Sequence, residues 1–541
     1  MKILGINGGL RQAYQDVSAC LVIDGVLVAA IEEERLNRIK FSAGKLPYLS
    51  VLEVLKIGNI TIQDVDMIAF HGSTWDAEID PRLTAFFENH FGYAPPIKRY
   101  HHHDCHAAST FYSSEFDEAL VITNDNSGDG ISFQVMHGKG TELTLLKRIS
   151  RPDSLGLFYQ IITQYCGFTK DSDEYKVMGL SSYGNRNRFD FQFLIDFVDG
   201  ELIINRDYIF VPQPGAPSMH KDEVVFNQAF IDKMGRKKRL NSADFDSFYK
   251  DVAASAQAHL EQLMLKITQH FMNQNGQINL CLAGGVSLNC VANQKIMNAD
   301  FVDSLFVFPA SSDAGIAVGA AYLAAIENGD TLHKMENTYW GNEFDNKAIE
   351  EVLVQCQTPY EFINDVTQKA AEDIAESKVI GWFQRRMEFG PRALGNRSIL
   401  ANACDPKMQD IVNQKIKLRE SFRPFCPSIL EEDVEMYFEG KQKVSPYMTI
   451  TYDVRENVKE LIPSVIHVDQ TARIQTVNEK QNPLFYQLLK NLKSLTKHGV
   501  VMNTSFNISN EPIVSTPREA LASFYGSGLD VLYLGNFRIT K

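Results

Sequence analysis

The sequence predicts an α/β fold of two domains, and three observations carry this prediction. The chain has 541 residues, which is too long for a single hydrophobic core. Apolar residues make up 44% of it and charged residues 22%, which is typical of globular protein. Short strands joined by tight turns come first and strand–loop–helix units follow, an order that indicates a mixed sheet covered by helices.

The hairpins lie before residue 140. Residues 17–32 alternate between apolar and polar around Asp24-Gly25, a two-residue turn signal. Three further strands are expected at residues 66–70, 119–123 and 131–135. The last two are joined by the turn-rich segment 124–130, so they form a second hairpin.

The strand–loop–helix units begin near residue 278. Strand 278–282 leads into the turn Ala283-Gly284-Gly285, and strand 305–308 leads into an Ala-rich helix over 315–326. Charge and turn signals then gather from 327 to 345, which indicates a domain boundary.

We therefore predict an N-terminal domain over residues 1–345 and a C-terminal domain over 346–541. The second domain is expected to open with a helix over 349–377, followed by a strand at 379–383.

Composition excludes several classes of protein. The net charge of −14 disfavours non-specific binding of nucleic acid, because phosphate contacts need clustered Lys and Arg. No apolar run approaches the ~20 residues of a membrane helix, and the N-terminus does not resemble a signal peptide. Eight cysteines without CxxC pairs fit a reduced, cytoplasmic protein. The sequence is also compatible with a homodimer.

A run of histidines at His101, His102, His103 and His106 is the first candidate site. If this stretch is helical, His102 and His106 lie one turn apart on one face and both imidazoles reach one metal ion. The alternative is a polar helix start with capping histidines. Two histidines make an incomplete site, so we expect carboxylates from loops that follow strands, with Asp125 and Asp313 as candidates.

Two glycine-rich turns open helices and suit a phosphate. The turn at Gly284 and Gly285, followed by Asn289, lets backbone N–H groups approach an anion at a helix N-terminus. The turn from Ser311 to Gly315 has the same form. Tight packing explains such glycines equally well, so each turn alone is weak evidence.

A basic cluster lies in the C-terminal domain. Between Arg385 and Arg423 there are nine basic and four acidic side chains, interleaved with Phe, Gly and Pro. Arginine offers a planar fork of donors for phosphate and carboxylate groups, so the cluster predicts a polyanion site. Structural ion pairs are the alternative. The candidate ligands in this cluster are Arg392, Arg397, Lys417, Arg419 and Arg423.

These segments together resemble the NodU/CmcH family of O-carbamoyltransferases. The resemblance runs nearly from end to end and includes the histidine run. Its motifs include residues 31–36 and 174–180, and the most specific ones are C-terminal, at residues 387–398, 419–425 and 503–507.

The resemblance implies an N-terminal actin/Hsp70-like domain, with ribonuclease H-like subdomains, and a C-terminal YrdC-like domain. In such enzymes the C-terminal domain forms carbamoyl-adenylate from carbamoyl phosphate and ATP. The N-terminal domain then uses iron or another divalent metal to pass the carbamoyl group to a hydroxyl of a small molecule. Mg(II) is expected with ATP, and we expect the C-terminal domain alone to carry the adenylation step.

The resemblance also assigns roles to residues of this chain. It implies metal ligands at His102, His106, Asp125 and Asp313, and catalytic roles for Asp16, His102 and Asp125. It implies binding of nucleotide and carbamoyl phosphate at Lys176, Gly284, Gly285, Asn289, Arg392, Arg397, Lys417, Arg419, Arg423, His467, Arg473, Asn503 and Ser505.

Three departures from the family pattern bear on activity. Gln15 stands where the family has His before Asp16, Gln470 stands where Gly is usual, and Asn510 precedes Glu511 in place of another Gly. Three alternatives therefore stay open: a tRNA threonylcarbamoyl-type transferase, a metallohydrolase, and a binding homologue without activity. The missing HExxH glutamate disfavours the hydrolase, and the acidic chain disfavours the tRNA enzyme.

Overall fold

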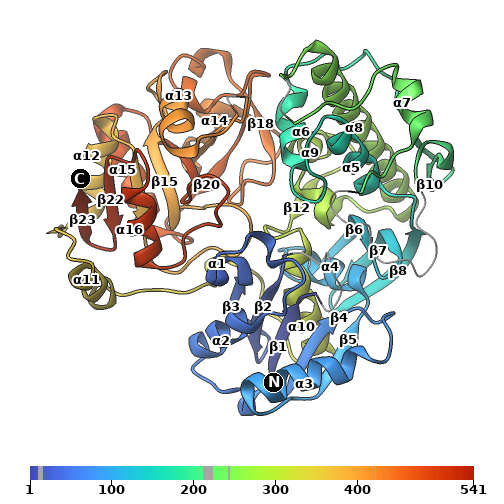
Figure 1. Cartoon of the computed structure of the whole chain (residues 1–541), viewed down its shortest axis with the longest axis horizontal. Coiled ribbons are helices and arrows are strands. Elements are labelled where there is room, and N and C mark those ends of the chain that lie inside the picture. The colour runs from blue at the N-terminus through green and yellow to red at the C-terminus, as the bar shows by residue number, and fades with distance from the viewer. Residues whose placement is uncertain (10–15, 211–222, 242–243, 421) are drawn as a thin grey trace. The chain divides into compact units, whose positions relative to one another are not determined.

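The computed structural model (Figure 1) describes residues 1–9, 16–210, 223–241, 244–420 and 422–541, so the Gln15 departure lies outside it. Contacts divide the chain into two compact units. Unit 1 comprises Met1–Leu27, Ala43–Pro47 and Ile60–Lys334, and unit 2 comprises Val28–Ser42, Tyr48–Asn59 and Met335–Lys541. The second unit therefore takes in two segments from the N-terminal part of the chain, which the expected division at residue 345 did not include.

Unit 1 contributes to two five-stranded sheets with the same strand arrangement. In each sheet, the strand that comes first in the chain lies in the middle. β1 pairs antiparallel with β2 and parallel with β4, and β6 likewise pairs antiparallel with β7 and parallel with β11. The first sheet has the order β3 (Val26–Glu32), β2 (Ser18–Ile23), β1 (Lys2–Asn7), β4 (Met67–His71) and β5 (Ile97–Tyr100). The second has the order β12 (Ser304–Val307), β11 (Asn279–Ala283), β6 (Glu118–Gly128), β7 (Ile131–Lys139) and β8 (Glu142–Ser150). This repeated order confirms the expected α/β class with ribonuclease H-like subdomains.

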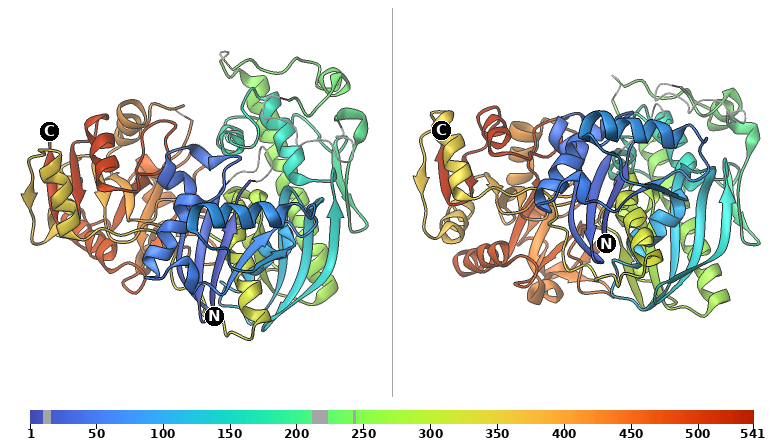
Figure 2. Two further views of the ribbon diagram at one scale, coloured as in Figure 1. Left: turned by 60° about the horizontal axis from the view of Figure 1, so that its bottom comes forward. Right: turned by 90° about the horizontal axis from the view of Figure 1, so that it is seen from below.

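Two helices of unit 1 fix the geometry between the sheets. α10 (Ile316–Glu327) packs on β1, β2 and β4 of the first sheet and also on α4 (His102–Phe111) (Figure 2). The approach is close, because a Cβ atom at Gly319 would lie 1.7 Å from the carbonyl oxygen of Cys105. The histidine-bearing helix is thereby held against the helix that follows Asp313.

The remaining elements of unit 1 are helices and one further hairpin, which is formed by β9 and β10. They are α3 (Ile79–Phe91), α5 (Leu155–Tyr165), α6 (Glu174–Ser181), β9 (Ile195–Val198), β10 (Glu201–Ile204), α7 (Gln228–Met234), α8 (Ser247–Asn275) and α9 (Cys290–Met297). Among the described residues, no helix combines the length and the apolar character needed to cross a membrane.

Unit 2 is built on an eight-stranded mixed sheet, the α/β architecture expected of the YrdC-like domain. Its order is β13 (Glu361–Phe362), β23 (Phe537–Thr540), β22 (Val531–Leu534), β14 (Ile380–Phe383), β15 (Arg397–Asn402), β21 (Val500–Ser505), β16 (Cys426–Leu430) and β20 (Gln475–Val477). A three-stranded sheet accompanies it, with the order β17 (Phe438–Glu439), β18 (Thr451–Val454) and β19 (Thr471–Arg473).

The core of unit 2 lies between the large sheet and two amphipathic helices, α12 (Val366–Ala375) and α15 (Pro483–Thr496). Trp382 and Tyr533 are fully buried there among leucines of α15. The other helices of this unit are α1 (Glu33–Asn37), α2 (Tyr48–Ile57), α11 (Asn346–Gln355), α13 (Met408–Val412), α14 (Val434–Tyr437) and α16 (Pro517–Tyr525).

Two sequence expectations need correction. The helix expected over 349–377 is interrupted, because α11 ends at Gln355, β13 follows, and α12 begins only at Val366. Pro359 explains the break, since proline disfavours the helical conformation of the residue before it. The turn expected over 124–130 is confined to Asp129-Gly130, while β6 continues to Gly128 with a shift of register that absorbs the extra residues.

Candidate functional site

The first candidate site is a cluster of two histidines and two aspartates in unit 1. His102 and His106 project from one face of α4, Asp125 comes from β6, and Asp313 begins the turn before α10. One ligand atom of each residue lies within 4.8 Å of the other three. The Nε2 atom of His106 is 3.4 Å from Asp125 Oδ2 and 3.5 Å from Asp313 Oδ1.

Burial and charge act against each other in this cluster. Both histidine side chains are fully buried. Burial alone would lower the pKa of His106, but the carboxylates of Asp125 and Asp313 outweigh it and raise that pKa to about 9. Burial would likewise raise the pKa of Asp125, but His102 and His106 hold it well below its usual range.

The donor set fits a divalent metal. Two imidazole nitrogens and two carboxylate oxygens converge, and this mixture suits Fe(II), Zn or Mn. A bound cation would also compensate the two partly buried carboxylates in place of a histidine proton. The assignment of these four residues as ligands stays a prediction.

The other two histidines of the run have structural contacts. The ring of His103 lies 2.6 Å from Thr123 Oγ1 through Nδ1 and 3.1 Å from the Ile131 carbonyl through Nε2. His101 Nδ1 accepts from the N–H of His103 at the start of α4. The capping interpretation therefore applies to His101, while His102 and His106 face the carboxylates.

Two neighbours of the cluster escaped the sequence analysis. The N–H of His102 donates to Asp129 Oδ2 at 2.9 Å, which fixes the first turn of α4. A Cβ atom at Gly128 would lie 2.0 Å from the His102 ring, so only glycine fits there. The available sequence signal is the turn-rich stretch 124–130, which predicted a hairpin turn and the ligand Asp125 but no role for Gly128 or Asp129.

The glycine turn that follows β11 lies against β6, the strand that carries Asp125. Gly284 has a φ of +89°, and a Cβ atom there would lie 2.1 Å from the Asn124 carbonyl oxygen. A Cβ atom at Gly285 would lie 3.2 Å from Asp125 Oδ1. Packing therefore explains Gly284, and the turn brings backbone close to the cluster.

The other predicted nucleotide ligands of unit 1 lie near this turn. Asn289 Oδ1 caps α9 by accepting from Ala292 N–H, and its amide also bonds Gln257. Lys176 on α6 pairs with Asp173 at 3.0 Å. The helices α6 and α9 touch where the sulfur atoms of Met178 and Cys290 lie 3.9 Å apart.

Asp16 lies two residues before β2. Its carbonyl accepts from Asn7 Nδ2 at 2.9 Å, and two residues later Ser18 Oγ donates to the carbonyl of Ala314 at 2.8 Å. Ala314 follows Asp313 directly. The bond from Ser18 thus links the segment that contains the predicted catalytic Asp16 to the Asp313 turn.

The second candidate site is a buried lysine in unit 2. Lys417 Nζ donates to the carbonyl of Ser505 at 2.6 Å and to Asn507 Oδ1 at 2.7 Å. Burial lowers the pKa of Lys417 well below its usual value, and Arg419 and Arg423 lower it further. Three basic side chains in one place, two of them arginines, indicate a site for an anion.

Each of the two arginines has a contact of its own. The Arg419 guanidinium stacks on the Phe425 ring at 4.4 Å, and its Nε donates to Asn413 Oδ1. Arg423 pairs with Glu420 at 3.4 Å. Asn507 ends the motif at 503–507, and its contact with Lys417 adds it to the cluster.

Strands β16 and β21 bring further predicted residues beside this lysine site. Asn503 lies opposite Cys426 in the ladder, and Arg473 Nη2 lies 3.1 Å from Cys426 Sγ. Ser505 lies two residues after Asn503 on β21. His467 Nδ1 lies 3.2 Å from Asp469, next to the Gln470 departure, where φ is +67°.

Arg397 does not fit the expected phosphate contact. Its guanidinium is fully buried 3.7 Å from the centre of the Phe383 ring. It donates to the carbonyls of Gln384, Arg385, Asn396 and Asn342. These contacts are those of a structural arginine that holds the chain entering β15. Arg392, by contrast, lies partly exposed in the loop before β15.

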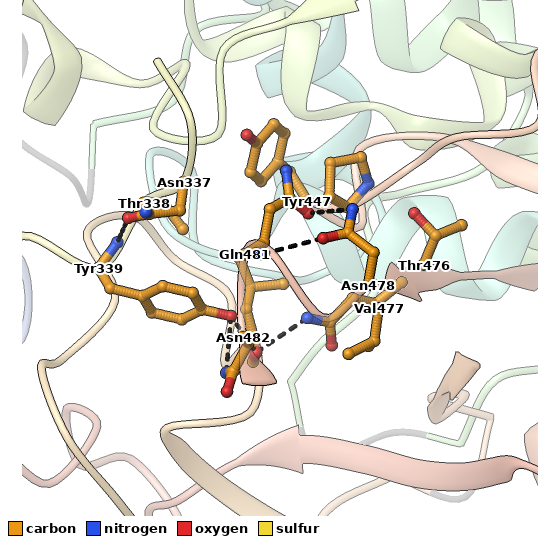
Figure 3. Close-up of a pocket in the computed structure, with 12 residues that line it drawn as sticks. Asn337, Thr338, Tyr339, Tyr447, Thr476, Val477, Asn478, Gln481 and Asn482 are labelled. Carbon is orange, nitrogen blue, oxygen red and sulfur yellow. Dashed lines mark hydrogen bonds between the residues drawn. The ribbon is translucent and has the colours of Figure 1, made fainter. Parts of the chain in front are cut away.

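A small recess in unit 2 is lined by residues that the sequence analysis did not single out (Figure 3). Asn482 Nδ2 donates to the Tyr339 hydroxyl at 3.0 Å, and Gln475 Nε2 donates to the Leu394 carbonyl at 2.8 Å. Gln475 Oε1 also accepts from Asn503 Nδ2 at 3.1 Å. The recess therefore adjoins the strand that carries Asn503.

Two family models match this chain. The model described as carbamoyltransferase N-terminus matches residues 88–322, and the model described as carbamoyltransferase C-terminus matches residues 371–541. An uncharacterized protein of Synechocystis sp. is 36% identical, with 98% of this chain and 96% of that protein aligned. The nodulation protein NolNO of Sinorhizobium fredii is 35% identical, with 100% and 83% aligned.

A relative named for its reaction is also similar. The 3'-hydroxymethylcephem-O-carbamoyltransferase of Amycolatopsis lactamdurans is 27% identical, with 74% of this chain and 70% of that enzyme aligned. Among solved structures, HypF of T. kodakarensis aligns with 62% of this chain and 48% of its own at 14% identity, with a TM-score of 0.37. The identity and coverage of the sequence relatives, together with both family models, show that this chain belongs to the carbamoyltransferase family of enzymes.

Proposed function

We propose that this enzyme is an ATP-dependent O-carbamoyltransferase that works in two steps. Carbamoyl phosphate, ATP and water give carbamoyl-adenylate, pyrophosphate and inorganic phosphate. The carbamoyl group then passes to a hydroxyl of a small molecule, with release of AMP. One observation carries the proposal: this carbamoyltransferase has a cluster of basic side chains around Lys417 in unit 2 and a His/Asp cluster in unit 1.

We assign the first step to unit 2. Carbamoyl phosphate and ATP are both polyanions, so a shared site needs several cations. Arg419 and Arg423 lie close enough to Lys417 to lower its pKa, which supports this assignment. Water would first release inorganic phosphate from carbamoyl phosphate to leave carbamate. A carbamate oxygen would then displace pyrophosphate from the α-phosphorus of ATP, and the arginine forks would stabilise the charge on the transferring adenylyl group. Mg(II) would accompany the ATP.

We assign the second step to the cluster in unit 1. His102, His106, Asp125 and Asp313 would hold a divalent cation, iron by family resemblance, and such a cation acts there as a Lewis acid toward a carbonyl group. The carboxylate of Asp125 is kept ionised by the two histidines, and Asp16 is proposed to receive the proton of the acceptor hydroxyl. The backbone at Gly284 and Gly285, with Lys176 and Asn289, is proposed to bind the nucleotide part of the adenylate.

The acceptor is proposed to be a hydroxyl on a natural product or sugar. The name of the Amycolatopsis relative specifies a hydroxymethylcephem, and two other relatives are named nodulation proteins. Transfer to such a hydroxyl would give an O-carbamoyl ester as the product.

The test separates the two steps by mutation of one histidine. In His106→Ala, we expect loss of bound metal and of transfer, while pyrophosphate release from ATP and carbamoyl phosphate continues at the wild-type rate. His103→Ala is the matched control, because His103 is equally buried on the same helix but bonds Thr123 and Ile131. Metal analysis is run beside both assays. Retained metal, or loss of both steps together, would contradict the site.

A further inference from the structure

The motif at residues 31–36 has no role in the reaction proposed above, yet three of its four charged side chains are buried. Glu32 and Arg35 are only 5% and 4% exposed. Both belong to the segment Val28–Ser42, which is part of unit 2 although it lies near the N-terminus. Burial of a charge is costly unless it is paired and hydrogen-bonded, so these side chains need specific partners.

Their shared partner is a single residue of the C-terminal part. The N–H of Gly390 donates to Glu32 Oε1 at 2.8 Å, and Arg35 Nη2 donates to the carbonyl of Gly390 at 3.0 Å. Arg35 is also paired with Glu34 at 2.7 Å. The motif thus holds both polar backbone groups of Gly390.

Gly390 opens the loop that carries Arg392. Its φ of +113° lies in a region that other residues rarely adopt, so the loop depends on contacts that hold it there. Glu388 closes the other side of the loop, where its Oε1 accepts from the N–H groups of Leu394 and Asn396 at 2.7 and 2.8 Å. Glu388 ties the loop to itself, whereas Glu32 and Arg35 tie it to the rest of unit 2.

The segment Val28–Ser42 also contacts residues 512–513, which follow the stretch of Ser505 and Asn507 beside Lys417. Arg38 donates to the carbonyls of Ile513 and Pro512 at 2.6 and 2.7 Å. This stretch returns to β21 immediately afterwards, because Val514 N–H donates to the carbonyl of Phe506 at 2.9 Å. Ser505 and Asn507, the acceptors of Lys417, flank Phe506.

We infer that Glu32 and Arg35 are positioning residues for carbamoyl-phosphate activation, because they fix the Gly390 loop, which carries Arg392 and whose Ala393 carbonyl accepts from Asn503 Nδ2 at 3.2 Å. The segment Val28–Ser42 then belongs functionally to unit 2. The role in activation rests on the proposed function, whereas the fixing of the loop does not.

The test uses the full chain with Glu32→Met and Glu32→Gln. Gln keeps an oxygen that accepts from Gly390 N–H, and Met removes it at similar volume. In Glu32→Met we expect the KM for carbamoyl phosphate in pyrophosphate release to rise about tenfold with kcat less affected, and Gln to restore most of the loss. Hydrogen exchange of the Gly390 amide should speed up in Met and stay close to wild type in Gln.

The matched control is Glu33→Met. Glu33 is also buried in this segment, but its carboxylate accepts from the N–H groups of Leu49 and Ser50 rather than from Gly390. We expect Glu33→Met to lose stability without faster exchange at Gly390. Unchanged exchange at Gly390 in Glu32→Met, or equal acceleration in Glu33→Met, would overturn the inference. If wild-type enzyme releases no pyrophosphate, the proposed function fails and the exchange data still decide the loop contact.

Discussion

At the scale of single residues, the spacing of the two histidines predicted the His/Asp cluster. Residue type alone did not distinguish an arginine with structural contacts from one available to a ligand. The i and i+4 positions of His102 and His106 fixed their common face, because helical geometry leaves no other arrangement. Nothing in the sequence distinguishes Arg392 from Arg397, since the two lie in the same motif. The difference arises from the strand that begins at Arg397, which turns its side chain toward Phe383 and four carbonyls.

This distinction gives a prediction for two arginines. Arg423→Ala should weaken carbamoyl-phosphate binding about tenfold or more, since a charge-assisted contact contributes ~1.5–3 kcal/mol, with little change in melting temperature. Arg397→Ala should instead destabilise the fold by about 3 kcal/mol or more, because it strips the donors from buried carbonyls. Pyrophosphate-release kinetics and thermal melts distinguish them. Unchanged binding in Arg423→Ala, or an unchanged melt in Arg397→Ala, would refute the respective assignment.

A second prediction at this scale concerns Gly128. Gly128→Ala should displace the His102 ring, because the new Cβ atom would lie 2.0 Å from it, and bound metal should be lost. Gly130→Ala is the control, since its Cβ meets open space and adds only the strain of a positive φ of +80°. Metal content of the two folded variants decides the matter. Full metal content in Gly128→Ala would show that the cluster tolerates movement of His102.

At the scale of elements, strands flanked by turn residues were predictable and interruptions were not. The hairpin at Asp24-Gly25 was predicted correctly, because both residues adopt the positive φ that this turn requires. The extension of β6 through Asn124–Gly128 was missed, since polar turn residues there pair in a ladder that only the tertiary fold supplies. The apolar face that continues from α11 into α12 likewise hid the break at Pro359.

Another element-scale prediction concerns the buried carboxylate that joins α12 to β22 and β23. Asp373 accepts from the Tyr533 hydroxyl at 2.6 Å and from Arg538 Nε at 2.9 Å. Burial would raise the pKa of Asp373, but Arg538, Lys378 and Tyr533 outweigh it and lower the pKa from 3.8 to about 2. A depressed carboxyl pKa stabilises the fold above the unfolded value and loses that effect as pH falls through the folded value.

We therefore expect Asp373→Asn to destabilise unit 2 at pH 7 by about 2 kcal/mol, as the pKa shift implies. The difference from wild type should shrink between pH 4 and pH 2. Urea unfolding across this range, followed by Trp382 fluorescence, measures it. A difference that stays constant down to pH 2 would show that the carboxylate is not the source of the stability. Lys369→Gln, a change at a half-buried position on the same helix, should leave the unfolding midpoint within error.

At the scale of the whole molecule, the resemblance predicted the classes of fold but not the path of the chain. The order of strands in each ribonuclease H-like sheet follows from that resemblance. The membership of Val28–Ser42 and Tyr48–Asn59 in unit 2 does not, because it depends on contacts between residues more than 300 positions apart. Local sequence patterns carry no signal for such pairing, although the charged motif at 31–36 marks one of its ends.

The last prediction is that the C-terminal domain as drawn from the sequence, residues 346–541, does not activate carbamoyl phosphate when isolated. It lacks Glu32 and Arg38, and also Asn342, which accepts from Arg397 and bonds Ser515 at 2.7 Å. Removing these partners leaves buried donors and acceptors without bonds, each costing about 1–3 kcal/mol, against the 5–15 kcal/mol that stabilises a typical domain.

The control is the whole chain cleaved at an engineered protease site between Asp345 and Asn346. Cleavage there leaves every segment of unit 2 present, so the nicked protein should release pyrophosphate at close to the uncut rate, while the isolated fragment should unfold without cooperativity. Circular dichroism melts and pyrophosphate assays on both preparations measure this. If fragment 346–541 melts cooperatively and works at the whole-chain rate, the N-terminal segments are dispensable. A nicked protein as inactive as the fragment would instead mean that the linkage at 345 matters more than the contacts.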